Sequence, residues 1–207
     1  MSAAGGASRP GTRERWDERH AAGMPIESPD PDPTLIDEVG GLRPGRALDL
    51  GAGDGRNAIW LAARGWRVTA VDFSPVALDR GRVRARSQGV EVPWLQADLL
   101  VWRPPRDRFD LVLLLFIHLP PEQRHEVLAR AASAVAPGGT LLVVGHDRSN
   151  LDAGTGGPHD PQVLYTPGEV AAELPGFTVE RAEVAPRKTG PGRPPLDAIV
   201  RAVRLTA

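Results

Sequence analysis

A glycine-rich run beside two carboxylates is the segment whose residue types best suit ligand binding. Asp49–Gly55 reads DLGAGDG and follows an apolar stretch. Glycines at alternate positions let the backbone turn sharply and let a ligand rest directly on the main chain. The spacing is G-x-G-x-G, whereas dinucleotide sites use G-x-G-x-x-G. Because Asp49 and Asp54 would repel a pyrophosphate and attract a sulfonium or an ammonium, the run favours a cationic ligand.

Two more carboxylates follow later apolar stretches. Asp72, in VTAVDFS, can accept hydrogen bonds from both hydroxyls of a ribose, and Phe73 beside it can offer its face to an adenine. Asp98 can accept a hydrogen bond from an adenine amino group. An Asp after a strand is often only a helix N-cap, but three such features in succession predict a nucleoside-type site.

Two histidines are candidate general bases. His118 (FIHLP) and His146 (VVGHDRSN) each follow an apolar stretch, and Asp147 adjoins His146. The alternative is that each histidine only forms hydrogen bonds within its loop. Tyr165, the only tyrosine, ranks below them. We predict no metal site, because no histidine pair has helical ligand spacing with an acidic third member.

The elements that must position these residues alternate between strand and helix patterns. The predicted strands are Arg46–Leu50, Arg67–Val71, Val92–Gln96, Phe109–Leu115 and Thr140–Val144. The predicted helices are Arg13–Ala22, Thr34–Val39, Asn57–Arg64, Pro75–Gln88 and Pro121–Val135. Such alternation indicates βαβ crossovers, and therefore a Rossmann-like, doubly wound α/β fold with a mostly parallel sheet.

The end of the chain has a different pattern. Phe177–Val184 and Leu196–Leu205 are rich in β-branched residues and predict an antiparallel hairpin at the sheet edge, which makes seven strands in all. The segment Asp147–Pro167 is dense in Gly, Asp and Pro, and a loop of that length is often functional. We expect a disordered tail over 1–12 and one domain over 13–207. Within that domain we expect an N-terminal helical cap over 13–45 and an acceptor-side loop over 146–168.

Composition excludes several classes of function. The 207 residues include no cysteine, so disulfides, thiolate zinc sites and a cysteine nucleophile are excluded. The formal charge of -1 argues against a nucleic-acid partner, and the basic run Arg80–Arg86 is typical of a solvated helix face. The longest apolar run, Leu111–Ile117, is too short to span a bilayer. We expect a cytoplasmic protein with a small-molecule partner and no membrane partner; the oligomeric state stays open.

Several motifs together resemble class I S-adenosylmethionine-dependent methyltransferases. They are ALDLGAGDG at Ala47–Gly55, VTAVDFS at Val68–Ser74, Ala97–Asp98, and PGGTLLVV at Pro137–Val144. The resemblance covers Trp16–Leu205. GDGRN at Gly53–Asn57, with the helix carrying Trp16, is similar to the small bacterial branch around the tellurite-resistance and thiopurine methyltransferases.

The resemblance implies S-adenosyl-L-methionine as cofactor and methyl transfer to a small-molecule acceptor by in-line displacement. It implies a cofactor site made of Trp16, Asp49, Gly51, Ala52, Gly53, Gly55, Asn57, Asp72, Phe73, Ser74, Asp98, Leu99 and Phe116. In it, Asp49 and the glycine backbone hold the methionine end, and Phe116 lines the methyl-transfer side. Trp16 either covers the sulfonium or pins the first helix to the core. Two alternatives remain: a protein of this fold that binds the cofactor without turnover, and an NAD-dependent oxidoreductase.

Overall fold

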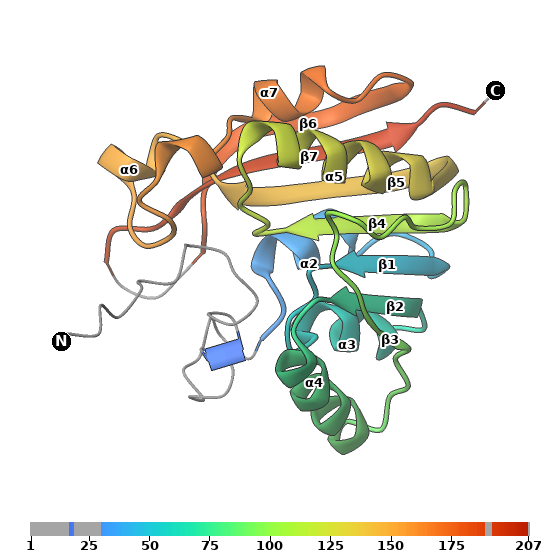
Figure 1. Ribbon diagram of the computed structural model, residues 1–207. Coiled ribbons are helices and arrows are strands. Elements are labelled where there is room, and N and C mark those ends of the chain that lie inside the picture. Colours follow the sequence, from blue (N-terminus) through green and yellow to red (C-terminus); the bar gives the residue numbers. More distant parts are fainter. Residues whose placement is uncertain (1–16, 19–29, 189–191, 207) are drawn as a thin grey trace, which may run out of the picture.

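The computed structural model describes residues 17–18, 30–188 and 192–206. The predicted tail, Trp16 and nearly all of the predicted helix Arg13–Ala22 lie outside them. The described chain forms one seven-stranded sheet in the order β3-β2-β1-β4-β5-β7-β6 (Figure 1). Its strands are β1 Arg46–Leu50, β2 Arg67–Asp72, β3 Trp94–Gln96, β4 Phe109–Leu115, β5 Val135–His146, β6 Phe177–Pro186 and β7 Leu196–Arg204.

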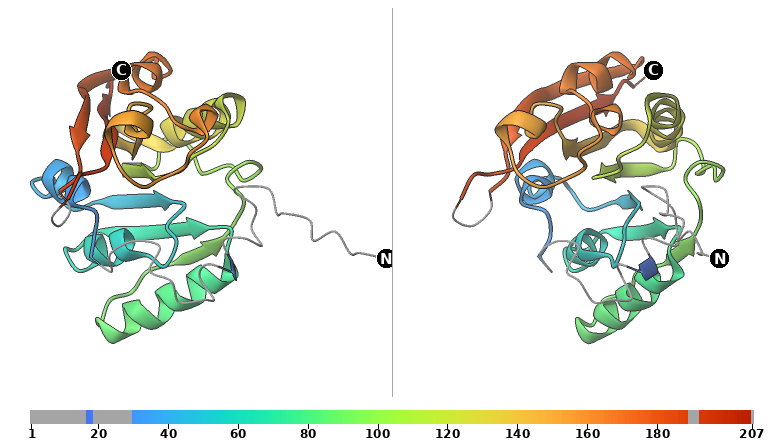
Figure 2. Two further views of the ribbon diagram at one scale, coloured as in Figure 1. Left: turned by 90° about the vertical axis from the view of Figure 1, so that its left-hand side faces the viewer. Right: turned by 60° about the vertical axis from the view of Figure 1, so that its left-hand side comes forward.

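The direction of the strands confirms the predicted fold class. β3, β2, β1, β4 and β5 pair in parallel, whereas β7 pairs antiparallel with both β5 and β6. The last two strands therefore form the predicted hairpin, with β7 against the sheet and β6 at the edge. Figures 1 and 2 show helices covering both faces of the sheet.

Two apolar cores lie on the two faces. One packs α5 (Pro121–Ala134) and α7 (Pro167–Ala172) on the sheet, and the other packs α2 (Pro33–Val39), α3 (Arg56–Ala62) and α4 (Pro75–Ser87). Along β4, Val112 and Leu114 belong to the first core, and Leu111 and Leu113 belong to the second. Because β4 is buried on both sides, its sequence is a continuous apolar run instead of an alternating one.

Many element boundaries differ from the prediction by one or more residues, including those of the three strands β3, β5 and β6. β3 begins at Trp94 rather than at Val92, because Pro93 has no N–H to donate to a ladder. β5 begins at Val135, five residues earlier than predicted, because Val135 pairs with Phe109 on β4. The third of these strands, β6, runs on to Pro186 at its C-terminal end.

Helical turns also occur where none was predicted. α7 begins at a capping box, in which the Thr166 hydroxyl accepts a hydrogen bond from the Glu169 N–H and the Glu169 carboxylate accepts one from the Thr166 N–H. This signal is present in the sequence. The segment predicted as a loop contains the short helix α6 (Asn150–Ala153) and a 3₁₀ turn at Pro161–Val163.

The parallel strands end together at one edge of the sheet, on the left in Figure 1 and facing the viewer in the left panel of Figure 2. The glycine run after β1 and the segment 147–166 after β5 both lie at this edge. In the part of the chain that the structure describes, no helix is long and apolar enough to cross a membrane.

Gly81 on α4 gives a test of the packing next to the glycine run. A Cβ at Gly81 would lie 2.5 Å from the Trp94 ring. Gly81→Ala gains about 1 kcal/mol of helix propensity, but overpacking against an aromatic ring costs about 1–3 kcal/mol. We expect a net loss of stability, measured by chemical denaturation. Val83→Ala, at a position on the same helix that is 65% exposed, should change stability by less than about 0.5 kcal/mol. A stabilised Gly81→Ala protein would contradict this packing.

Candidate functional site

The glycine run forms a tight loop at the carboxyl end of β1. Gly51, Gly53 and Gly55 have φ angles of +72°, +56° and +78°, in the left-handed region that favours glycine. The N–H groups of Gly51 and Ala52 donate to the Val71 carbonyl, at 2.8 and 3.0 Å. A Cβ at Gly51 would lie 2.2 Å from the Ile117 side chain, so glycine is required there for space as well as for its φ angle.

Asp72 ties this loop to the end of β2. One carboxylate oxygen accepts a hydrogen bond from the Gly53 N–H, and the other accepts one from the Ser74 N–H, both at 2.8 Å. The Ser74 hydroxyl in turn caps α4 by accepting from the Ala77 N–H at 3.1 Å, and it donates to Asp17. The side chain of Asp72 is therefore fixed beside the loop.

Asp49 lies under the same loop and is 2% exposed. Its Oδ2 atom is buried and accepts no hydrogen bond within the described chain. Burial and the neighbouring charge of Asp72 raise the pKa of Asp49 to about 7, although a hydrogen bond from the Ala58 N–H opposes the shift. Two carboxylates thus lie together next to a bare backbone, an arrangement that a cation would stabilise.

The other residues that were predicted to bind the cofactor lie as follows. Phe73 is half-buried beside Asp72, and Asp98 is exposed, with Oδ1 accepting from the Leu100 N–H at 2.8 Å. The Leu99 carbonyl accepts from Arg130 on α5. Asn57 lies at the start of α3, where its amide oxygen accepts from the Asp32 N–H at 2.9 Å and so holds the segment before α2. Trp16 is outside the described residues.

A cluster of rings lies at the ends of β4 and β5. Phe116 has a φ angle of +57°, an uncommon conformation for a bulky residue, and its N–H donates to the Val144 carbonyl at 2.7 Å. The Phe116 and His146 ring centroids are 5.7 Å apart, and those of His118 and His146 are 5.3 Å apart. The Tyr165 ring is fully buried against His118.

His118 is held neutral. Its Nε2 atom accepts a hydrogen bond from the His146 backbone N–H at 3.1 Å, which places its proton on Nδ1. Burial and the neighbouring His146 lower the pKa of His118 to about 3. Its accepting lone pair is therefore used to fix the end of β5.

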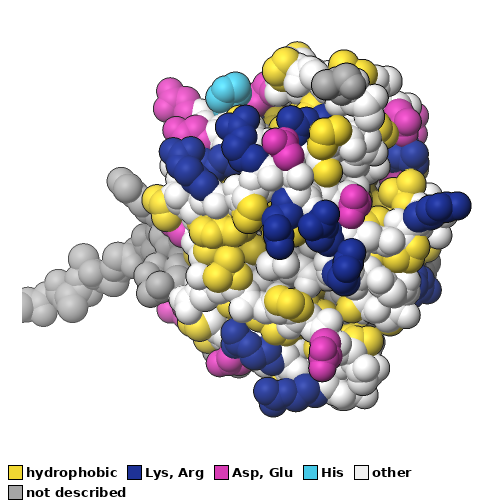
Figure 3. Space-filling model, turned by 90° about the vertical axis from the view of Figure 1, so that its right-hand side faces the viewer, with side chains coloured by type: hydrophobic (Ala, Val, Ile, Leu, Met, Phe, Trp, Pro, Cys, Tyr) yellow, Lys and Arg dark blue, Asp and Glu magenta, His cyan; other side chains and the backbone are white. Residues whose placement is uncertain are grey.

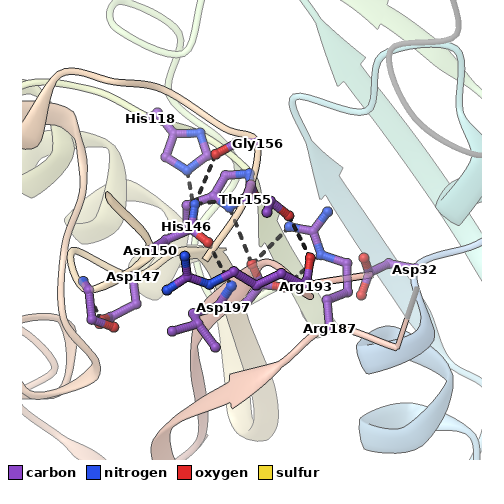
Figure 4. Close-up of polar contacts among 12 residues, drawn as sticks. Asp32, His118, His146, Asp147, Asn150, Thr155, Gly156, Arg187, Arg193 and Asp197 are labelled. Atoms are coloured by element: carbon purple, nitrogen blue, oxygen red, sulfur yellow. Dashed lines mark hydrogen bonds and ion pairs between the residues drawn. The ribbon is translucent and has the colours of Figure 1, made fainter. Parts of the chain in front are cut away.

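His146 is 6% exposed and lies under the backbone of Gly157, at which a Cβ would come within 2.5 Å of the imidazole. Burial and the charge of Arg187 lower the pKa of His146, while Asp197 opposes the shift. Figure 4 shows Arg187 and Asp197 beside it. At neutral pH the imidazole is uncharged and can accept a proton.

Sequence reasoning missed the charged groups around His146. Asp147, its neighbour in sequence, turns its carboxylate to the Ser149 N–H and hydroxyl instead. The groups that face the imidazole, Arg187 and Asp197, come from the C-terminal hairpin. The one signal in the sequence was an acidic residue at the start of β7, directly before the apolar run Ala198–Val200. Among the described residues, no group of three or more His, Cys, Asp or Glu side chains could hold a metal ion.

The region that contains the glycine loop matches known proteins in sequence. Residues 47–139 match the sequence model of a family described as a methyltransferase domain. The demethylmenaquinone methyltransferase of Thermus thermophilus is 36% identical over 103 residues, which cover 49% of this chain and 47% of that protein. The matched region spans about half the length of the curated relatives.

Solved structures share the fold. The 1,6-didemethyltoxoflavin-N1-methyltransferase of Burkholderia thailandensis, with S-adenosylhomocysteine bound, has a TM-score of 0.69 at 23% identity, covering 94% of this chain and 87% of that one. TehB of Haemophilus influenzae has a TM-score of 0.66 at 15% identity, covering 84% and 62%.

These matches confirm the resemblance found in the sequence motifs. Residues 47–139 match a methyltransferase domain in sequence, and the described chain has the Rossmann-like fold of the solved methyltransferases.

Proposed function

We propose that this protein is an S-adenosylmethionine-dependent methyltransferase that acts on a small-molecule acceptor. The observation that carries the proposal is the buried Asp49 carboxylate beneath the glycine loop. Among the described residues, nothing donates a hydrogen bond to its Oδ2, and its pKa is raised to about 7 beside Asp72. The Asp49 and Asp72 carboxylates would repel a pyrophosphate, whereas they would attract a sulfonium and an ammonium.

The residues at the loop fit this cofactor. Asp49 and the backbone of Gly51 and Gly53 would hold its methionine end, and Asp72 would accept from the ribose hydroxyls. Phe73 would pack on the adenine, and Asp98 with the Leu99 amide would bind the adenine edge. When bound, the cofactor supplies a methyl group that is activated by positively charged sulfur. The chain therefore has mainly to align the acceptor and exclude water.

On the acceptor side, His146 would act as the general base. It is neutral at pH 7 because its pKa is lowered, and it lies 5.7 Å from the strained Phe116 at the end of β4. A neutral imidazole can accept the proton of a hydroxyl such as a phenol or an enol. Relatives named for demethylmenaquinone and 1,6-didemethyltoxoflavin support a small acceptor.

We also propose that the protein works in the bacterial cytoplasm without a nucleic-acid partner. The absence of cysteine and the formal charge of -1 support this. On the face opposite the site, Figure 3 shows basic, acidic and apolar side chains, with several Lys and Arg side chains grouped near the centre of the view.

The function is tested first by binding and then by transfer. Calorimetry should show binding of S-adenosylmethionine and S-adenosylhomocysteine but not of NAD. Incubation of methyl-labelled cofactor with a panel of phenols, enols, thiols, amines and carboxylic acids should release S-adenosylhomocysteine only when an acceptor is present. Binding without transfer to any member would favour the silent binder, and preference for NAD would refute the proposal.

Asp49 should make the free energy of unfolding depend on pH. The carboxyl has an ordinary pKa of 3.8 and a native pKa of about 7, so between these values the native state keeps a proton that the unfolded state has lost. Stability conferred by the protonated group is therefore lost as pH rises through this window. Asp49→Asn should equal wild type near about pH 4 and exceed it by up to about 4 kcal/mol near about pH 8.

Chemical denaturation of both proteins across this range measures the difference. Asp79→Asn serves as the matched control, because its carboxylate on α4 is 74% exposed. Its unfolding profile should run parallel to wild type. If the Asp49→Asn profile is parallel as well, the raised pKa is wrong.

Gly157 should matter for transfer and not for cofactor binding. A side chain at Gly157 must displace either the loop or the His146 imidazole, whereas nothing lies within 4 Å of a Cβ at Gly156. Both glycines have positive φ angles, +68° and +79°, so Ala strains the backbone similarly at either site. Gly157→Ala should reduce turnover by roughly tenfold or more. Gly156→Ala is the control, and equal turnover in the two variants would count against an acceptor site at His146.

A further inference from the structure

A buried carboxylate lies on the strand next to that of His146. Asp197 is the antiparallel partner of His146 in the β5–β7 pair, and its side chain is fully buried. The next residues on β7, Ala198 and Ile199, are buried and apolar. An ionised carboxylate is strongly disfavoured in such surroundings unless charged and polar groups compensate it.

Arg187 provides this compensation. Its Nε and Nη2 atoms donate to the two oxygens of Asp197, at 2.6 and 2.8 Å, in a bidentate pair. The same guanidinium lies 4.1 Å above the centroid of the Phe116 ring. Arg187 is thus held between the predicted methyl-transfer side of the site and the buried carboxylate, and it fixes the orientation of that carboxylate.

The imidazole of His146 faces Asp197 but lies slightly too far from it for a hydrogen bond. Its Nδ1 atom lies 3.6 Å from Oδ1 of Asp197 and is buried without a hydrogen-bond partner in the described chain. The ring is stacked on His118 and covered by Gly157, which restricts its orientation. Figure 4 shows His146 between His118 and the Asp197–Arg187 pair.

The other titratable groups near His146 carry no charge at neutral pH or face elsewhere. His118, from the end of β4, is neutral, and burial raises the pKa of Tyr165, from the segment before α7. Directly after β5, Oδ1 of Asp147 accepts hydrogen bonds from the Ser149 N–H and hydroxyl, and its Oδ2 is buried without a hydrogen-bond partner in the described chain. Arg187 and Asp197 are therefore the ionised groups that act on the imidazole.

We propose that Asp197 is a positioning residue for His146: it accepts the Nδ1 proton and leaves the Nε2 lone pair for the acceptor, while Arg187 orients the carboxylate and limits its pull on that proton. The proposal rests on His146 being the base in the proposed function. When the acceptor proton moves to Nε2, the imidazole becomes a cation, and Asp197 offsets its charge until the proton is released to solvent.

Asp197 raises the pKa of His146 and Arg187 lowers it. A purely structural role of the pair would change His146 in the same way when either residue is replaced, so the direction of each pKa shift distinguishes positioning from structural support. Removing either one breaks the same salt bridge. Asp197→Asn removes a negative charge, so the pKa of His146 should fall. Arg187→Gln removes a positive charge, so the pKa of His146 should rise.

The experiment is a pH titration of the ¹⁵N-labelled free protein, followed by long-range ¹H–¹⁵N spectra of the imidazoles. The chain has five histidines, and His146→Gln assigns the signal of His146. Wild type should show neutral His146 with its proton on Nδ1. Asp197→Asn should lose the preference for the Nδ1 proton and shift the midpoint down by about one pH unit, and Arg187→Gln should shift it up by a similar amount.

Glu173→Gln is the matched control, because Glu173 lies 3.1 Å from Nδ1 of the exposed His125 and should leave the His146 signal unchanged. Shifts of His146 in the same direction in both variants, or none in either, would overturn the proposal. If Asp197→Asn does not fold, Arg187→Gln alone tests the proposal. The midpoint of the His146 titration should move up in that variant, and an unchanged midpoint would overturn the proposal.

Measurements of turnover distinguish this proposal from the proposed function. With an acceptor from the panel, Asp197→Asn should lower turnover by about tenfold or more and leave the affinity for S-adenosylhomocysteine unchanged. Unchanged turnover with a shifted His146 titration would refute the positioning role and leave the methyltransferase intact. Failure of the wild type to bind the cofactor would refute the proposed function, and the imidazole titration would still report the contact between Asp197 and His146.

Discussion

The burial of the Asp49 carboxylate beneath the glycine-rich loop 51–55 is the constraint on which the site depends. A carboxyl with a pKa of about 7 next to Asp72 destabilises the folded protein near neutral pH. Three left-handed glycines and the hydrogen bonds from the loop to Val71 and Asp72 hold the arrangement in place. A cation is the ligand that converts this unfavourable burial into binding energy, which is why the loop favours a sulfonium over a phosphate.

The sheet brings a second set of groups to the same edge. The parallel strands place Phe116, His118 and His146 beside the loop, and the antiparallel hairpin adds Asp197 and Arg187 from the end of the chain. The methyltransferase domain match ends at residue 139. His146, Arg187 and Asp197 therefore lie outside the matched region.

The fold and the tight glycine loop after β1 could be predicted from sequence because their signals are local. The glycine spacing, the apolar run of β4 and the carboxylates after successive strands are each contained in a few residues. The early start of β5 could not be predicted, because Pro137, Gly138 and Gly139 normally break strands and only the pairing of Phe109 with Val135 extends it. The contact between His146 and Asp197 depends on the register of two strands 51 positions apart in sequence. For α7 the capping box was visible, but its short length weakened the periodic pattern.

Proton release on cofactor binding tests the central claim most directly. At about pH 6, Asp49 with its raised pKa is mostly protonated, and a bound cation should ionise it. Calorimetry of S-adenosylmethionine binding in buffers with different enthalpies of ionisation should therefore show release of roughly one proton from wild type and none from Asp49→Asn. Binding without proton release, or equal release from the two proteins, would contradict the account.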